Sequence, residues 1–416
     1  MLVLRSRWIL PIADGPLLNG WIALDRGRVA AVGRASSSLP FRNDAPLVDL
    51  GEMAVMPALV NAHTHLELSW MAGRVRRHER FTDWVREMLG LRRQSTPPPE
   101  EVAASIDAAI AQAKASGTGL VGDISNSLAT VDPLRRSDLR GVVFHELLRL
   151  RARDADDVLE QGLLALERAG ASERVAVSLA PHAPYSVSPQ LFQGIRAALT
   201  RMPFLPTSVH LGESPEEVEL LATGQGPWRQ LLEDLGAWDP AWRPPGCGPV
   251  EYLDRMKLLG PRTLAVHGVQ FGVDELARLA ATGATLVTCA RSNEYVGVGA
   301  PPVERFYRAG VRVAIGTDSL ASVDDLNLFK ELAAVRALAP AVSAASLLAS
   351  ATLQGARALG FEADFGTIEP GRRAPLIAID LPASVSDVEE YLVGGIAPPA
   401  VHWVEDLLGD RAKYAH

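Results

Sequence analysis

Residues 60–69 read VNAHTHLELS and follow an apolar run, residues 53–59, that reads MAVMPAL. The composition of this run predicts a β-strand, on which side chains two positions apart lie on the same face. His63 and His65 are therefore expected to point to one place, while Thr64 points elsewhere. Two imidazoles that converge from one rigid strand supply half of the ligands of a metal site. Chance placement on a polar turn is the alternative, and ligand-type residues further along the chain argue against it.

The run before His63 is the first of eight strand-like runs, at residues 55–61, 119–124, 141–147, 174–180, 207–211, 263–269, 284–289 and 311–316. Helix-like segments lie between most of them, for example at residues 100–116, 155–169, 189–199 and 273–281. A strand followed by a helix, repeated eight times, predicts an α/β fold of the TIM-like (β/α)8 barrel type. A doubly wound open sheet is the alternative, but no GxGxxG turn follows the first strand.

The two ends of the chain have a different pattern. Residues 21–33 read WIALDRGRVAAVG, which predicts a β-hairpin, and residues 375–380 are again strand-like. We predict that residues 1–54 and 366–416 together form one small β-sandwich domain. The barrel, a metal-dependent hydrolase domain of residues 55–365, is then inserted between the two halves of the small domain.

Composition limits the classes of partner. The chain has 416 residues, a net charge of -8 and a pI near 5.7, which argues against binding to nucleic acid or to a membrane surface. No stretch reaches the roughly 20 apolar residues of a membrane span, and the first residues lack the features of a secretion signal. Two cysteines, Cys247 and Cys289, suit a reducing compartment. We expect a cytoplasmic protein that acts on a small molecule; the sequence leaves its oligomeric state open, with a homodimer as one option.

Polar side chains follow almost every strand-like run. In a (β/α)8 barrel the active site lies at the C-terminal ends of the strands, and core packing does not explain so many titratable groups there. The residues in question are His63, His65, Asp123, Glu146, His182, His210, Glu213, His267, Arg291, Ser292, Asn293 and Asp318.

Three imidazoles and one carboxylate, from His63, His65, His210 and Asp318, suit one divalent ion with a position left for water. Zn²⁺ fits this set, and Fe²⁺ and Ni²⁺ are alternatives. Such an ion lowers the pKa of water to roughly 7. Glu213, three residues after His210, is placed to take a proton from that water and to pass it to the substrate.

The sequence around these residues reads SVHLGES at 208–214, AVHG at 265–268 and IGTDS at 315–319. Together with the HxH triplet, these motifs resemble the amidohydrolase superfamily, and within it the cytosine-deaminase-like branch of aminohydrolases. The resemblance covers nearly the whole chain. It implies one metal held by the four ligands above, with Glu213, His267 and Asp318 as catalytic residues and Asp318 relaying a proton to the departing amine.

Strand four ends in SLAPHAPY, residues 178–185, and has no lysine. Superfamily members with two metals bridge them with a carboxylated lysine from this strand, so the resemblance favours a single metal and deamination of a ring. That chemistry is hydrolysis of a C–N bond in a cyclic amidine, of the EC 3.5.4 type. His182 resembles the substrate-contacting histidine of nucleoside-type deaminases.

The strongest local similarity is to the aminodeoxyfutalosine deaminases of menaquinone biosynthesis. It rests on HLELS at 65–69, HLGES at 210–214, TGQG at 223–226, CARSN at 289–293 and TDSLAS at 317–322. The resemblance implies an aminopurine nucleoside as substrate. The expected substrate contacts are His182, Trp84, Trp70, Glu67, Arg149, Arg291, Ser292, Asn293 and Ser319. Arg149, Arg151, Arg291 and the arginines of residues 74–80 are all candidates for a substrate carboxylate.

Three other functions are the alternatives to this one. A deaminase of adenosine, S-adenosylhomocysteine or another amino-heterocycle would use the same site, as would a hydrolase that releases chloride from a chloro-triazine. A non-catalytic scaffold of the superfamily would have lost ligands that this chain retains. Residues 223–250, rich in Gly, Pro and Trp, are expected to form a lid over the site rather than a plain surface loop.

Overall fold

The computed structural model describes residues 1–34, 45–95, 97–170, 172–373 and 375–409. Eight parallel strands form the expected barrel, as two four-stranded sheets that close on each other. The first sheet contains β6 (Leu59–Thr64), β7 (Thr118–Ser125), β8 (Arg140–Leu147) and β9 (Val175–Pro181). The second contains β10 (Thr207–Leu211), β11 (Thr263–His267), β12 (Thr285–Thr288) and β13 (Arg312–Ile315). The predicted TIM-like fold is therefore confirmed.

Backbone hydrogen bonds close the ring at both seams. The His210 amide donates to the His182 carbonyl at 2.9 Å, which joins the end of β9 to β10. The Thr317 amide donates to the His63 carbonyl at 3.1 Å, which joins the segment after β13 to β6. Gly316 allows this second seam, because a Cβ at that position would lie only 2.8 Å from the His63 carbonyl oxygen. The closing seam thus brings the first and last ligand-bearing segments together.

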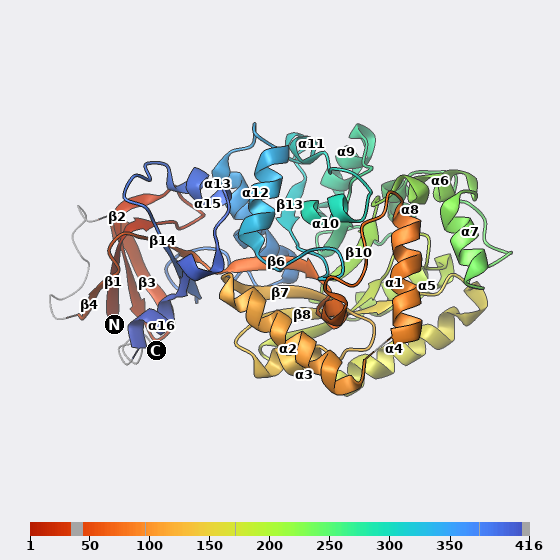
Figure 1. The fold of residues 1–416 in the computed structure, drawn as a ribbon, viewed down its shortest axis with the longest axis horizontal. Helices are drawn as coiled ribbons and strands as arrows, with labels where there is room; N and C mark the ends of the chain where they lie inside the picture. Colours follow the sequence, from red (N-terminus) through yellow and green to blue (C-terminus); the bar gives the residue numbers. More distant parts are fainter. Residues whose placement is uncertain (35–44, 96, 171, 374, 410–416) are drawn as a thin grey trace.

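Helices cover the outside of the barrel (Figure 1). Those predicted from the sequence are present as α2 (Pro99–Ala115), α4 (Ala155–Ala169), α5 (Pro189–Thr200) and α9 (Val273–Thr282). Serine side chains cap the N-termini of two helices. Ser188 accepts from the Leu191 amide at α5, and Ser214 accepts from the Glu217 amide at α6 (Pro215–Thr223). The other helices are α1 (Phe81–Ser95), α3 (Val131–Arg136), α6 (Pro215–Thr223), α7 (Pro227–Asp234), α8 (Pro249–Arg255), α10 (Ala290–Tyr295), α11 (Val303–Arg308), α12 (Leu328–Leu338), α13 (Ala344–Ala349), α14 (Gly355–Leu359), α15 (Val388–Val393) and α16 (Val404–Leu408).

The interior of the ring is apolar. Side chains from both four-stranded sheets form one buried cluster, which includes Val60 of β6, Phe144 of β8, Val266 of β11 and Ala314 of β13. Cys289 belongs to the same cluster and is fully buried, so it is a core residue. This packing holds the strands in place, and the polar residues at their C-terminal ends are positioned by it.

Both ends of the chain build one sheet, which lies beside the barrel in Figure 1. Its order is β15-β14-β5-β1-β2-β3, with β4 paired to β1. The predicted hairpin is β2 (Leu17–Asp25) with β3 (Arg28–Arg34), and β14 (Leu376–Asp380) pairs antiparallel with β5 (Met53–Pro57). The remaining strands are β1 (Leu2–Ile9), β4 (Leu47–Asp49) and β15 (Val401–Trp403).

Strand β5 runs across the expected boundary between residues 54 and 55. The exact division into domains stays a prediction. Residues 410–416, assigned to the small domain, lie outside the described residues. Segment 223–250 holds α7 and the start of α8, joined by an irregular stretch, and its function as a lid likewise stays a prediction. Among the described helices, none combines the length and the apolar character needed to cross a membrane.

Candidate active site

The four predicted ligands meet at the C-terminal ends of the strands. The Nε2 atoms of His63 and His65 are 3.2 Å apart, and those of His65 and His210 are 3.3 Å apart. Asp318 Oδ1 lies 3.4 Å from His65 Nε2 and 3.8 Å from His63 Nε2. Residues from β6, β10 and the segment after β13 therefore converge on one point.

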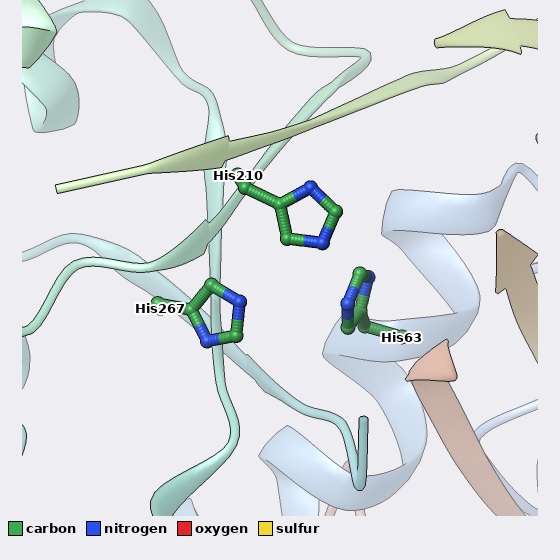
Figure 2. A group of neighbouring side chains, drawn as sticks. All are labelled: His63, His210 and His267. Atoms are coloured by element: carbon green, nitrogen blue, oxygen red, sulfur yellow. The ribbon is translucent and has the colours of Figure 1, made fainter. Parts of the chain in front are cut away.

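These spacings fit a metal ion. Two ligand nitrogens bound at about 2.0–2.1 Å to one tetrahedral ion lie roughly 3.3 Å apart, close to the separations among these imidazoles. In Figure 2 the side chains of His63, His210 and His267 point toward a common space. Neutral imidazoles gain little from such nitrogen-to-nitrogen contacts by themselves. The donor set suits one divalent ion, with His63, His65, His210 and Asp318 as its ligands.

Burial keeps these histidines neutral, as ligands must be. Desolvation, followed by repulsion from neighbouring cationic groups, lowers the pKa of His65 to about 3. Burial likewise lowers the pKa of His210 to about 4, and that of His63 well below its usual range. The ring lone pairs are therefore available at neutral pH.

Partners behind the ligands fix their orientation. Ser292 donates to Asp318 Oδ2 at 2.6 Å, and the His210 Nδ1 lies 3.1 Å from the His182 carbonyl oxygen. A hydrogen bond from Nδ1 to that carbonyl leaves the His210 Nε2 lone pair for a metal. Asp318 itself has a left-handed backbone, with φ of 64°, a conformation uncommon outside glycine and frequent at functional sites.

Glu213 and His267 lie beside the ligands, with His267 Nε2 3.5 Å from Glu213 Oε1. Both side chains are buried. Burial, and then repulsion from Asp318, raises the pKa of Glu213 well above its usual range, so this carboxyl group readily holds a proton. The backbone amides of Gly212 and Glu213 donate to the Glu217 carboxylate at 3.0 Å, which fixes the turn that presents Glu213.

A cavity of about 400 Å³ opens in front of these residues. Its polar lining includes His65, His210, Glu213, His267 and Asp318, and helices α1 and α7 supply about half of its apolar wall. Of the predicted substrate contacts, His182, Trp84, Arg149 and Ser319 line it. A cavity of about 420 Å³ between the small sheet and the start of the barrel strands is slightly larger, but its lining has no histidine.

The other predicted substrate contacts are not among the residues that line the cavity. Glu67 accepts from the Ser127 amide at 3.0 Å and from the Ser125 hydroxyl. Arg291 is paired with Asp325 at 3.0 Å. The Trp70 ring packs under the Arg74 guanidinium, Ser292 binds Asp318, and the Asn293 amide nitrogen lies 3.0 Å from His267 Nδ1. Ser292 and Asn293 thus contact the reacting groups and not the cavity.

The arginines proposed for a substrate carboxylate differ in whether their guanidinium groups already have partners. Arg151 lines the cavity, but its guanidinium donates to the carbonyls of Gly236 and Trp238. In the segment 74–80, Arg76 pairs with Glu87 and Arg77 covers the Tyr295 ring. Arg149 lines the cavity, is exposed, and has no hydrogen bond or ion pair to its guanidinium among the described residues.

Sequence reasoning missed Arg92, Asn126 and most of the apolar wall. Arg92 lies near the end of α1 and Asn126 directly follows β7, and both line the cavity. The position of Asn126 after a barrel strand was an available signal. No sequence signal pointed to Arg92, because only the packing of α1 over the barrel brings it there.

A second group of possible ligands is Glu146, His182 and His210. His210 cannot serve two ions here, because its Nε2 faces the first ligand group and its Nδ1 faces the His182 carbonyl. No lysine ends β9 to bridge a pair of ions. The described residues thus support one metal ion.

Comparison with known proteins identifies the family of this chain. The model of the family described as "Amidohydrolase family" matches residues 54–405. An aminodeoxyfutalosine deaminase of Deinococcus radiodurans is 34% identical over 325 residues, which are 75% of this chain and 74% of the relative. A 5-methylthioadenosine/S-adenosylhomocysteine deaminase of Teredinibacter turnerae is 28% identical over 399 residues, 91% of this chain and 84% of the relative.

Solved structures share the fold. An adenosine deaminase of Xanthomonas campestris with bound zinc has a TM-score of 0.80 and 27% identity, and covers 96% of this chain and 90% of its own. The aminofutalosine deaminase of Helicobacter pylori in complex with methylthio-coformycin has a TM-score of 0.84 and 25% identity. That match covers 94% of this chain and 95% of the other.

Proposed function

The chain belongs to the amidohydrolase family and is a hydrolytic deaminase of the aminohydrolase class, and we propose that it deaminates an aminopurine nucleoside with aminodeoxyfutalosine as its preferred substrate. The observation that carries the deaminase function is the convergence of the four proposed ligands on one point, with Glu213 and His267 beside them at the cavity. Zinc is the metal we propose, since the related adenosine deaminase structure binds it.

In the proposed reaction the four ligands would hold the ion. When bound, a divalent ion lowers the pKa of water to roughly 7 and so supplies hydroxide at neutral pH. Glu213 accepts a proton from the attacking water at a carboxylate oxygen and gives it to the ring nitrogen beside the amine-bearing carbon. The new C–O bond forms at that carbon as the ring nitrogen is protonated.

His267 and Asp318 complete the reaction. His267 Nε2, 3.5 Å from Glu213 Oε1, is placed to donate to the attacking oxygen. Asp318 accepts the remaining proton of that oxygen and passes it to the amino group, which leaves as ammonia. The carbon keeps the oxygen as a ring carbonyl, so water and amine are exchanged with no other reactant.

Arg149 supports the choice of aminodeoxyfutalosine, which carries a carboxylate. Among the arginines that line the cavity, Arg149 is the one whose guanidinium has no partner among the described residues. An arginine can bind a carboxylate through two parallel hydrogen bonds. The D. radiodurans relative, 34% identical to this chain, bears the same substrate in its name.

A 5-methylthioadenosine or S-adenosylhomocysteine deaminase is the second candidate. Its support is that relatives of this name recur among the similar proteins and match up to 95% of this chain. S-adenosylhomocysteine also carries a carboxylate, so Arg149 alone does not separate the two.

The test is ammonia release from metal-replete enzyme. Aminodeoxyfutalosine, adenosine, 5-methylthioadenosine, S-adenosylhomocysteine, guanine, cytosine and a triazine form the panel. We expect kcat/KM of roughly 10⁴ M⁻¹s⁻¹ or more on aminodeoxyfutalosine and at least tenfold less on the other compounds. Preference for 5-methylthioadenosine or S-adenosylhomocysteine would select the second candidate, and turnover of only free bases or the triazine would refute both.

A further inference from the structure

One wall of the active-site cavity carries a row of polar groups that the deamination chemistry does not use. The row runs from Arg92 on α1, through Asn126 after β7, to Glu146 on β8. Arg92 Nη1 donates to Asn126 Oδ1 at 3.3 Å, and Asn126 Nδ2 donates to Glu146 Oε2 at 2.9 Å. Because the amide of Asn126 has a donor on one side and an acceptor on the other, its orientation is determined.

Glu146 is the acceptor at the inner end of this row. Its side chain is 6% exposed and belongs to the cavity lining, so what it can contact is the occupant of the cavity. Asn126 binds Oε2, while Oε1 lies 3.5 Å from His210 Nδ1. That Nδ1 faces the His182 carbonyl at a shorter distance, 3.1 Å, and this leaves Oε1 with capacity to accept another hydrogen bond.

Glu146 lies next to the proposed metal ligands without being one of them. Glu146 Oε1 neighbours the Nδ1 side of His210, whereas the metal-binding Nε2 is on the opposite side of the same ring. Glu146 is thus separated from the proposed metal position by the His210 ring, and it faces a part of the cavity occupant other than the reacting carbon. Carboxylates are the groups by which proteins accept hydrogen bonds from ribose hydroxyls in dinucleotide sites.

We propose that Glu146, held by Asn126, accepts a hydrogen bond from a sugar hydroxyl of the substrate and makes the enzyme selective for ribonucleosides. This inference rests on the proposed function and adds a specificity residue to it. Asn126 occupies one carboxyl oxygen of Glu146 and leaves the other to accept from the hydroxyl. A site with a buried acceptor rejects an analogue that lacks the donor, because the acceptor is then left without a partner.

A simpler role for Glu146 would be to orient His210 through its Nδ1. That role predicts a loss of metal affinity and an equal loss of activity on every substrate when Glu146 is changed. The hydroxyl-binding role predicts a loss that depends on the hydroxyl groups of the substrate, so the two roles separate by experiment.

The variant for the test is Glu146→Gln. Because Asn126 Nδ2 binds at the Oε2 position, the glutamine carbonyl takes that place and its NH₂ group replaces Oε1, which turns an acceptor into a donor. We compare kcat/KM on adenosine, 2′-deoxyadenosine and 3′-deoxyadenosine, and the affinities for coformycin and 2′-deoxycoformycin by calorimetry. Metal content is measured in each preparation.

For the native enzyme we expect kcat/KM on adenosine to be about 10- to 100-fold higher than on at least one deoxy analogue, which is the range for loss of a hydrogen bond to a charged group. In Glu146→Gln that ratio should fall to within about threefold of unity, with metal content unchanged. Glu67→Gln is the matched control, since Glu67 is a buried carboxylate near Arg92 that does not line the cavity. Its ratio should equal that of the native enzyme.

The inference would be overturned if the native enzyme preferred adenosine over both deoxy analogues by less than threefold in kcat/KM, or if Glu146→Gln kept the native preference. Either result would leave the deaminase function intact. Loss of metal together with equal losses on all three nucleosides would assign Glu146 to the orientation of His210 and overturn it as well. Absence of nucleoside turnover and of coformycin binding in the native, metal-replete enzyme would refute the proposed function itself. If Glu146→Gln does not fold, Glu146→Asp, which keeps the charge but withdraws it, is expected to weaken the discrimination without removing it.

Discussion

The imidazole of His267 is held between two groups from different parts of the chain. Asn293 Nδ2 lies 3.0 Å from its Nδ1, and Glu213 Oε1 lies 3.5 Å from its Nε2. A donor at Nδ1 selects the tautomer with the proton on Nε2, which then faces Glu213 and the cavity. His267 also has a left-handed backbone, with φ of 80°, so the surrounding packing must hold it in place. Asn293 is therefore a positioning residue.

Asn293→Asp should lower kcat by about 10²–10⁴-fold with little change in metal content. An aspartate accepts a proton at the His267 Nδ1 position and selects the wrong tautomer, although it has the same shape as asparagine. Steady-state kinetics and metal analysis check this. A kcat within twofold of the native value would show that the tautomer of His267 does not matter.

Glu213→Gln should also lower kcat by about 10²–10⁴-fold, because the amide cannot accept the proton that Glu213 carries between water and the ring nitrogen. Glu213 is not among the four proposed ligands, so the variant should bind one metal ion per chain. Binding of a nucleoside analogue, measured by calorimetry, should survive. Unchanged turnover would remove Glu213 from the mechanism.

Helices α1 and α7 meet over the cavity through a chain of aromatic rings. Trp84 stacks on Phe81 at 6.0 Å, Phe81 meets Trp228 edge-on at 5.7 Å, and Trp228 stacks on Tyr185 at 3.9 Å. All four rings line the cavity. These rings connect the two helices to the segment that follows β9. The proposed metal ligands lie at the C-terminal ends of the barrel strands.

Trp228→Ala should raise KM by about tenfold or more and lower kcat much less, because it opens the wall without touching a metal ligand. Loss of a buried tryptophan costs about 3–5 kcal/mol of stability, so the melting temperature should also fall. Arg86→Ala is the control: it breaks the exposed ion pair with Asp234 that also links α1 to α7, worth about 0–1 kcal/mol. Equal effects of the two variants on KM would contradict the role of the aromatic rings.

The metal site ties together parts of the molecule that lie far apart in the sequence. His63 belongs to the first barrel strand, β6, and His65 follows the end of that strand directly. His210 comes from the second four-stranded sheet, and Asp318 from the segment that closes the ring onto β6. An ion bound by all four would hold both sheets and the closing seam.

Removal of the metal by a chelator should therefore lower the melting temperature by several degrees as well as abolish activity. A ligand present at about 100 times its Kd stabilises the folded state by about 2.7 kcal/mol. Calorimetric melting before chelation, after it, and after addition of zinc checks the effect. Metal-free enzyme that melts at the native temperature would mean that the barrel closes independently of the site.

Much of this molecule was predictable from its sequence, because the relevant signals are local. Strand composition followed by helical segments identified the barrel, and each ligand directly follows or ends a strand-like run, as with His210 at the end of β10. The pairing of the two chain ends into one sheet was also expected from strand patterns. In each case neighbouring residues carry the information.

The shape of the cavity was decided by the tertiary structure alone. Glu67 follows the HxH motif closely, yet its carboxylate turns to Ser125 and Ser127, whereas Arg92, 27 positions after His65, reaches the cavity from α1. Asn293 was expected to contact substrate, yet it contacts His267. The sequence by itself determined the barrel and the ligand types, which depend on strand periodicity and residue chemistry. Which side chains face the substrate depended on how α1 and α7 pack over the strands, and long-range packing leaves no periodic signal in the chain.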